Sequence, residues 1–211
     1  MNSTEKEISY QISNTYSTLN SLTKQTKNVW LVCHGMGYLS RYFLKYFKDL
    51  DPTENYIIAP QAQSKYYLKD QFKHVGASWL TKENTIAETH NILNYLDAVI
   101  ENEQIPSNHN FIVIGYSQGV SIAMRYVSSR KLQCNHLVLM SGGLPKELTE
   151  EDLSFYKGKV SMIYGTKDEY LHSDRLDYER NRMDELFGEK AEIIPFDGNH
   201  MVNVELINSL V

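Results

Sequence analysis

Short apolar runs alternate along the chain with longer stretches in which apolar residues recur at helical spacing. The strand-like runs cover residues 28–33, 56–59, 111–114, 136–140, 160–164 and 191–196. The helix-like stretches cover residues 38–50, 85–102, 117–129, 173–187 and 201–210. From residue 28 onward strands and helices therefore alternate. This order predicts an α/β fold built on one mostly parallel, doubly wound sheet with helices on both faces.

Three segments do not fit the simple alternation. Residues 8–20 alternate loosely, with Ile8, Tyr10 and Ile12 able to share one face, which predicts an antiparallel hairpin at the sheet edge within residues 1–27. Residues 61–83 are rich in Gln, Tyr, Lys and Trp, and we expect a long loop with a short helix. The segment between strands 136–140 and 160–164 is too short for a lid domain. Residues 144–156 within it are expected to form one short helix. We therefore expect a single domain over residues 1–211.

A Gly-x-Ser-x-Gly motif, Gly115-Tyr116-Ser117-Gln118-Gly119, follows the strand at 111–114. A serine between a strand and a helix sits on a tight turn that pushes its hydroxyl above the sheet edge. The flanking glycines let the two backbones approach each other, and the free N–H groups of the helix start lie beneath the reacting carbonyl. Ser117 is the candidate nucleophile.

A serine hydroxyl needs an adjacent base, and in this architecture an acid and then a histidine follow it along the chain. Asp168 comes shortly after the strand at 160–164, and His200 comes shortly after the strand at 191–196. We predict Asp168 as the acid and His200 as the base. The local rival of Asp168 is Glu169, and two more acids lie in the next helix, Asp174 and Asp177. Among the other histidines, His74 and His172 stay open, whereas His90, His109 and His136 are weaker candidates.

The first central strand ends in Cys33-His34-Gly35-Met36-Gly37, whose glycines leave the backbone free to approach a ligand. One backbone N–H of this loop, at Met36, and the backbone N–H of Gln118 are the predicted oxyanion donors. We expect His34 to shape the loop instead of acting as a base, because it follows an early strand.

These three segments resemble the α/β-hydrolase superfamily, and within it the small carboxylesterase, phospholipase and acyl-protein thioesterase group. That group carries a His-Gly-x-Gly oxyanion loop and a Gly-x-Ser-Gln-Gly elbow, which stand here at 34–37 and 115–119. The resemblance implies Ser117, Asp168 and His200 as catalytic triad, with Met36 and Gln118 as oxyanion donors. The chain departs from the group at Tyr38, Val120 and Asn199, which weakens the transfer of substrate preference.

Composition narrows the possible partners. Apolar residues make up 42% and charged residues 22%, which is typical of a soluble globular protein. The net charge of -5 makes nucleic acid an unfavourable partner.

No secretory signal and no membrane-spanning apolar stretch stand out, so we expect a cytoplasmic protein without integral membrane association. Cys33 and Cys134 lie in apolar runs and are predicted to be buried free thiols. No metal constellation or phosphate-binding loop is seen, so no cofactor is expected.

The leading hypothesis is a serine hydrolase that cleaves a small-molecule carboxylic ester or thioester through an acyl-enzyme. Tyr66, Tyr67, Phe72 and Trp79 are interpreted either as walls of an apolar acyl pocket or as side chains that pack the 61–83 loop onto the sheet. An alternative within the class is a lysophospholipase or a sugar-ester deacetylase with the same triad. An alternative of another class is a catalytically idle α/β-hydrolase that serves as a binding module.

Overall fold

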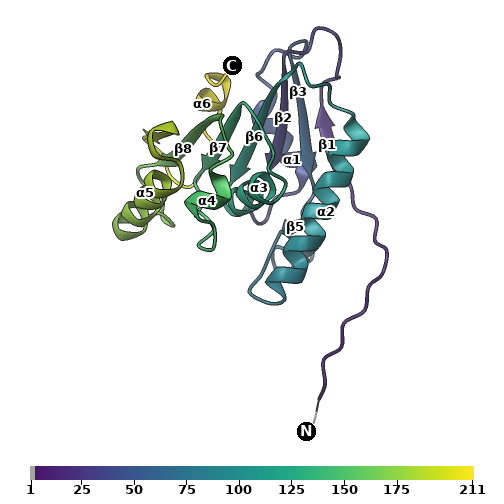
Figure 1. The fold of residues 1–211 in the computed structure, drawn as a ribbon. Coiled ribbons are helices and arrows are strands. Elements are labelled where there is room, and N and C mark those ends of the chain that lie inside the picture. Colours follow the sequence, from purple (N-terminus) through teal and green to yellow (C-terminus); the bar gives the residue numbers. More distant parts are fainter. Residues whose placement is uncertain (1–2) are drawn as a thin grey trace.

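The computed structural model describes residues 3–211, and its centre is a seven-stranded sheet with the order β1-β3-β2-β6-β7-β8-β9. Strand β1 runs antiparallel to β3, and all other neighbours in the sheet run parallel. The strands are β1 (Tyr16–Leu19), β2 (Asn28–Cys33), β3 (Asn55–Pro60), β6 (Asn110–Tyr116), β7 (His136–Met140), β8 (Lys159–Gly165) and β9 (Ala191–Phe196). The predicted doubly wound, mostly parallel sheet is thus confirmed (Figure 1).

Helices cover both faces of this sheet. They are α1 (Ser40–Phe43), α2 (Thr85–Glu103), α3 (Gln118–Ser129), α4 (Glu150–Leu153), α5 (Ser173–Phe187) and α6 (Val204–Asn208), with short 3-10 helices η1 (Leu44–Phe47) and η2 (Gly188–Lys190). Buried side chains of α2, α3, α4 and α5 belong to one hydrophobic cluster, and those of η1, α1 and α6 belong to the other. In the described part of the chain, no helix is long and apolar enough to cross a bilayer.

Strand β2 shows why a continuous apolar run forms a central strand. All six of its residues are buried. Val29, Leu31 and Cys33 pack into the cluster beneath α2 and α3, whereas Trp30 and Val32 pack into the cluster beneath α1 and α6. A parallel strand covered on both faces needs apolar side chains at every position, not at alternate ones. Cys33 and Cys134 are both free and buried, as expected.

The N-terminal prediction is correct at the sheet edge and wrong in detail. Strand β1 pairs antiparallel with β3, with Tyr16 opposite Pro60 and Leu19 opposite Ile57. It does not form a hairpin with a strand of its own, because residues 3–15 contain no strand. Ile8, Tyr10 and Ile12 are instead 84%, 77% and 66% exposed on an arm that extends away from the body (Figure 1).

The segment at 61–83 also differs from its prediction. It contains a separate two-stranded antiparallel sheet, β4 (Ser64–Tyr67) and β5 (Val75–Ser78), and no helix. All four residues of β4 are exposed, so this hairpin lacks the buried face that would mark a strand in the sequence. The N–H of Gly37 donates a 2.8 Å hydrogen bond to the carbonyl oxygen of Ala77, which fastens the hairpin to the loop after β2.

Three helical segments are shorter than predicted, and one of them is α6, which covers only Val204–Asn208 of the expected 201–210. The helix expected at 38–50 is split into α1 and the 3-10 helix η1. The segment between β7 and β8 holds only the four-residue helix α4, so no lid domain is inserted there. Helix α4 begins at a capping box, in which the hydroxyl of Thr149 and the carboxylate of Asp152 each accept a hydrogen bond from the other residue's backbone N–H. The carboxyl edge of the sheet is therefore left without a large cover on this side.

Candidate active site

Ser117 lies on the tight turn between β6 and α3, with φ 52° and ψ -118°. This is a strained conformation for a residue with a side chain, and such strain is found where function requires it. Its N–H donates a 2.8 Å hydrogen bond to the carbonyl oxygen of Met140 at the end of β7. A Cβ on Gly115 or Gly119 would overlap backbone atoms of α3 or of β2, so both glycines are needed for the close approach of strand and helix.

His200 and Asp168 come from the loops after β9 and β8 and meet Ser117 at the carboxyl edge of the sheet. The distance between His200 Nε2 and Ser117 Oγ is 3.0 Å, and that between His200 Nδ1 and Asp168 Oδ2 is 2.8 Å. Two backbone hydrogen bonds hold these loops together, from Thr166 to Phe196 and from Lys167 to Gly198. Three residues that are far apart in sequence are thus brought into one hydrogen-bonded chain.

The hydrogen bonds define the protonation pattern of this chain of residues. A carboxylate only accepts hydrogen bonds, so Nδ1 of His200 donates to Asp168 and carries the proton. In the neutral imidazole, Nε2 is then the acceptor for the hydroxyl of Ser117. Asp168 is buried, and its second oxygen accepts a 2.9 Å hydrogen bond from the N–H of Tyr170. The carboxylate is therefore fixed from two directions.

Two tyrosines that the sequence analysis did not single out pack against the imidazole of His200. The ring centroid of Tyr170 lies 4.7 Å from that of His200, and the centroid of Tyr116 lies 5.3 Å from it. The Tyr116 hydroxyl also donates a 3.1 Å hydrogen bond to the His200 carbonyl oxygen. Their closeness to the triad candidates could have been noticed in the sequence, since Tyr116 directly precedes Ser117 and Tyr170 follows Asp168 by two residues.

The rival residues lie elsewhere or contact other groups. Glu169 accepts a 3.4 Å hydrogen bond from the backbone N–H of His200 and does not contact its ring nitrogens. His136 is buried at the start of β7, the end away from Ser117, and its Nε2 lies 2.8 Å from Ser161 Oγ. Burial is the main cause that lowers the pKa of His136 to about 4, and the charge of Lys159 acts in the same direction against the smaller opposing effect of Glu192.

His34 is fully buried at the start of the loop formed by residues 34–37. Its Nδ1 donates a 2.8 Å hydrogen bond to the carbonyl oxygen of Gly35, and its Nε2 accepts a 3.1 Å hydrogen bond from the N–H of Ala62. Burial lowers the pKa of His34 to about 4, against the smaller opposing effect of the Gly35 hydrogen bond. The neutral ring therefore bridges two backbone segments, which is a loop-shaping arrangement.

Met36 and Gln118 bring their backbone N–H groups to the same edge as Ser117. In residues 3–211, neither N–H has a hydrogen-bond acceptor.

The side chain of Gln118 makes hydrogen bonds to the segment that follows β5. Its Oε1 accepts a 2.8 Å hydrogen bond from the N–H of Trp79, and its Nε2 donates a 2.7 Å hydrogen bond to the carbonyl oxygen of Leu80. Gln118 thereby joins the start of α3 to the end of the β4–β5 hairpin.

The four aromatic residues considered as pocket walls lie in two different environments, with Phe72 exposed like the two tyrosines. Trp79 is only 1% exposed, and its ring packs 5.0 Å from that of His34, so it packs behind the 34–37 loop and offers no surface to a ligand. Tyr66 and Tyr67 on β4 are 39% and 56% exposed. A Cβ on Gly37 would lie 3.8 Å from the hydroxyl of Tyr66, which puts that hydroxyl beside the loop.

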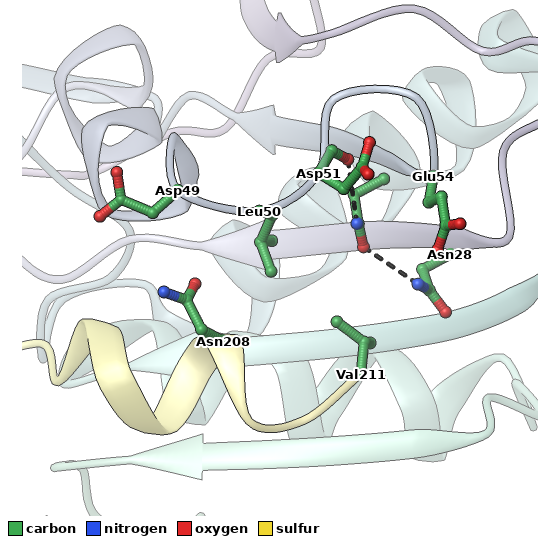
Figure 2. A pocket seen from close by; sticks show the side chains of 8 residues that line it. Asn28, Asp49, Leu50, Asp51, Glu54, Asn208 and Val211 are labelled. Atoms are coloured by element: carbon green, nitrogen blue, oxygen red, sulfur yellow. Dashed lines mark hydrogen bonds between the residues drawn. The ribbon is translucent and has the colours of Figure 1, made fainter.

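A hollow of about 200 Å³ lies at the amino ends of β2 and β3, at the other end of the strands from Ser117 (Figure 2). It is lined by Asn28, Asp49, Leu50, Asp51, Glu54, Asn55, Asn208 and Val211. The amide of Asn28 donates to Asn55, which in turn donates to the carbonyl oxygen of Asp51. Asn28 and Asn55 begin β2 and β3, whereas Ser117 follows the end of β6, so this hollow is remote from the candidate site.

Residues 3–211 contain no group of three or more His, Cys, Asp or Glu side chains that could hold a metal ion.

Comparison with protein families gives a match over residues 14–208 to the model described as Phospholipase/Carboxylesterase. The chain belongs to this family. The match covers every strand of the central sheet and all three residues at the hydrogen-bonded site. No curated protein sequence matches the chain.

Solved structures share the fold of this phospholipase/carboxylesterase family member at low sequence identity. Acyl-protein thioesterase 2 of Zea mays is 14% identical with a TM-score of 0.67, covering 94% of this chain and 96% of that chain. Esterase PE8 is 18% identical with a TM-score of 0.69, covering 94% and 98%. The Bacillus cereus carboxylesterase is 17% identical with a TM-score of 0.65, covering 93% and 91%. The fold is that of the α/β-hydrolases.

Proposed function

We propose that the protein is a serine hydrolase that cleaves a carboxylic ester or a thioester through an acyl-enzyme. The observation that carries this proposal is the continuous chain of hydrogen bonds from Asp168 to His200 (2.8 Å) and from His200 to Ser117 (3.0 Å). Family membership supports esterase or thioesterase chemistry as the general activity.

In the proposed reaction, His200 takes the proton of the Ser117 hydroxyl as the oxygen attacks the carbonyl carbon of the substrate. The tetrahedral oxyanion accepts hydrogen bonds from the backbone N–H groups of Met36 and Gln118. His200 then gives its proton to the leaving alcohol or thiol, and the acyl group remains on Ser117. A water molecule, deprotonated by His200, hydrolyses this acyl-enzyme. Asp168 holds the imidazole in the required tautomer and stabilises its protonated form.

Within residues 3–211, no large structural element covers Ser117 from the β7–β8 side, so the site suits a substrate that does not have to be enclosed by the protein. Helix α4 is the only helix between β7 and β8, and Met36 is 60% exposed beside the site. Tyr66 and Tyr67 are the aromatic side chains that we propose as contacts for the apolar part of the substrate. Both lie on the exposed β4 strand, on the hairpin that is fastened to the 34–37 loop. Trp79 is left out of this proposal because it is buried.

Labelling with a fluorophosphonate probe, followed by mass spectrometry of the adduct, tests the proposal. We expect one adduct, at Ser117, that is lost in Ser117→Ala. Ser121→Ala is the matched control, because Ser121 lies one turn further along α3 and its hydroxyl is bonded to Arg125. A folded wild-type protein that stays unlabelled and turns over neither p-nitrophenyl butyrate nor butyryl-coenzyme A would contradict the proposal and favour an idle binding module.

A further inference from the structure

The turn that follows β7 runs directly beside Ser117. A Cβ on Gly142 would overlap the carbonyl oxygen of Ser117, so only glycine fits against the nucleophile turn at this point. Gly143 follows, and both glycines are partly exposed. At both glycines the side-chain position is already occupied, by the Ser117 carbonyl oxygen and Val120 at Gly142 and by Arg175 at Gly143. The bare backbone of this turn, the glycine floor, therefore lies between the Ser117 turn and Arg175.

The guanidinium of Arg175 lies over this floor. Arg175 is in the first turn of α5, and a Cβ on Gly143 would collide with its Nη2 atom. Glu179, one turn later on the helix, forms an ion pair with the guanidinium, with 2.5 Å between Oε1 and Nη2 but without hydrogen-bond geometry. The other carboxylate oxygen of Glu179 accepts a 2.9 Å hydrogen bond from the N–H of Leu144. Glu179 is 0% exposed, whereas the Arg175 side chain is 37% exposed. A fixed buried carboxylate therefore orients an accessible cation.

This cation has unused binding capacity and a second cation nearby. A guanidinium carries five N–H donors, and the Glu179 contact uses one of its terminal nitrogens. The Tyr178 ring is flanked by both Arg175 and Lys146, at 5.5 and 5.8 Å from the ring centroid. Lys146 is exposed and makes no ion pair with any residue in 3–211.

The acidic residues around these cations leave the positive charge accessible. Glu147, next to Lys146, is paired with Arg125 at 2.6 Å. Asp174 and Asp177 are exposed on α5, and within residues 3–211 neither forms an ion pair with Arg175 or Lys146. In a chain with a net charge of -5, the Gly142–Gly143 floor is thus flanked by two cations.

We propose that Arg175, assisted by Lys146, binds a carboxylate or phosphate group of the substrate, so that the protein prefers an anionic ester. The inference rests on the proposed function and adds the substrate class. Ligands of doubly wound sheets lie across the carboxyl ends of neighbouring strands. The 34–37 loop follows β2 and the glycine floor follows β7, the two strands on either side of β6, which leads into Ser117. A substrate bound across these loops places one end over the glycine floor. A planar guanidinium binds both carboxylate and phosphate through paired hydrogen bonds.

Two matched substrate pairs test the inference and locate the anionic group. The first pair has a charged or neutral acyl part, p-nitrophenyl hemisuccinate and p-nitrophenyl butyrate. The second pair has a charged or neutral alcohol part, butyryl-glycerol phosphate and butyryl-glycerol. We expect the wild-type protein to prefer the anionic member of one pair. Arg175→Gln is expected to lower kcat/KM for that substrate by about 10- to 100-fold, the loss typical of a hydrogen bond to a charged group. The neutral member should change by no more than about twofold.

Further variants keep the test decisive. Arg175→Lys retains a positive charge beside Glu179 and should lose part of the preference, because it lacks the planar fork. Lys146→Glu should weaken the preference without disturbing the fold, since Lys146 is exposed. Its matched control is Lys45→Glu, on η1 against the opposite face, which should leave both substrate pairs unchanged.

Either of two results overturns the inference. One is a wild-type protein that hydrolyses the neutral esters and shows no preference for the anionic member of either pair. The other is a preference that survives in Lys146→Glu and in both Arg175 variants. Both would leave the proposed function standing, because neutral esters are still cleaved. A wild-type protein that cleaves no ester and carries no label at Ser117 would overturn the two together.

Discussion

The indole nitrogen of Trp79 donates a 2.7 Å hydrogen bond to the carbonyl oxygen of His34. The bond joins the end of the β4–β5 hairpin to the loop whose Met36 N–H we propose as an oxyanion donor. The backbone N–H of Trp79 is held at the same time by the side chain of Gln118, the residue after Ser117. Trp79 thus contacts the 34–37 loop through its side chain and the nucleophile turn through its backbone N–H.

Trp79→Phe tests this role. The variant keeps an aromatic ring behind His34 but leaves the His34 carbonyl oxygen without this donor, so the free energy of unfolding should fall by about 1–3 kcal/mol. A displaced oxyanion donor affects the transition state more than the bound substrate, so kcat should fall by about 10-fold or more while KM changes little. Denaturant unfolding and steady-state hydrolysis of p-nitrophenyl butyrate measure both. An unchanged kcat in a stably folded variant would remove Trp79 from the account.

Gly119→Ala addresses the close contact between α3 and β2. A Cβ on Gly119 would overlap backbone atoms of Cys33 and His34, which cannot move without shifting the central strand. We expect a loss of more than about 3 kcal/mol in unfolding free energy or failure to fold. Gly188→Ala is the matched control, because no other atom of the described residues 3–211 lies within 4 Å of its Cβ position and only its φ of +53° is unfavourable. That variant should lose about 1 kcal/mol. Equal losses in the two variants would contradict the packing argument.

Asp168→Asn separates orientation of the imidazole from binding of the substrate. The asparagine amide can present its N–H to Nδ1 of His200 and favour the wrong tautomer, so Nε2 would no longer accept the Ser117 proton. We expect kcat to fall by about 10³- to 10⁴-fold with little change in KM. Glu169→Gln is the control, since Glu169 contacts only the backbone N–H of His200. A larger loss of kcat in Glu169→Gln than in Asp168→Asn would show that Glu169, and not Asp168, is the acid of the triad.

Two buried histidines predict how stability depends on pH. The pKa of His34 and of His136 is about 4 in the folded protein, chiefly because burial disfavours the charged ring. The unfolded chain takes up protons at these residues below its ordinary pKa of about 6.5, whereas the folded protein does not, so stability falls as the pH drops from about 6.5 toward 4. At about pH 5 each histidine should cost about 2 kcal/mol relative to neutral pH.

His136→Gln measures one of these contributions. The variant should lose less unfolding free energy than the wild type between neutral pH and about pH 5, with denaturant unfolding as the assay. His90→Gln, at an exposed position on α2, is the control and should keep the wild-type dependence. If His136→Gln and the wild type lose the same free energy on acidification, the burial argument for His136 is wrong.

The parts of the fold that sequence patterns predicted are those whose side chains meet the core. Strands β2 and β7 have the predicted bounds, and every residue in them is buried. The β4–β5 hairpin was missed because all four β4 side chains face solvent, so no alternation records the pairing. Ile8, Tyr10 and Ile12 do alternate, yet they are exposed, because a period of two indicates an extended chain and does not specify a partner strand.

At the site, motif spacing and strand order were enough to select Ser117, Asp168 and His200 as candidates, because each follows the end of a strand. The same reasoning left Trp79 open between lining a pocket and packing the 61–83 loop, and its burial behind the 34–37 loop supports the packing role. Burial is a property of tertiary packing, and an aromatic residue in a polar segment looks the same whether it lines a pocket or supports a loop. Arg175 was missed for a related reason. Its position over Gly143 depends on how α5 crosses the β7 turn, which no local pattern encodes.

The most direct test of the central claim is detection of the acyl-enzyme itself. The protein is mixed with p-nitrophenyl butyrate, quenched in acid within the first turnovers, and examined by intact-mass and peptide mass spectrometry. We expect a mass increase of one butyryl group on Ser117, absent in Ser117→Ala and strongly reduced in His200→Ala. Turnover of the ester with no acyl group on Ser117 at any quench time would contradict the central claim.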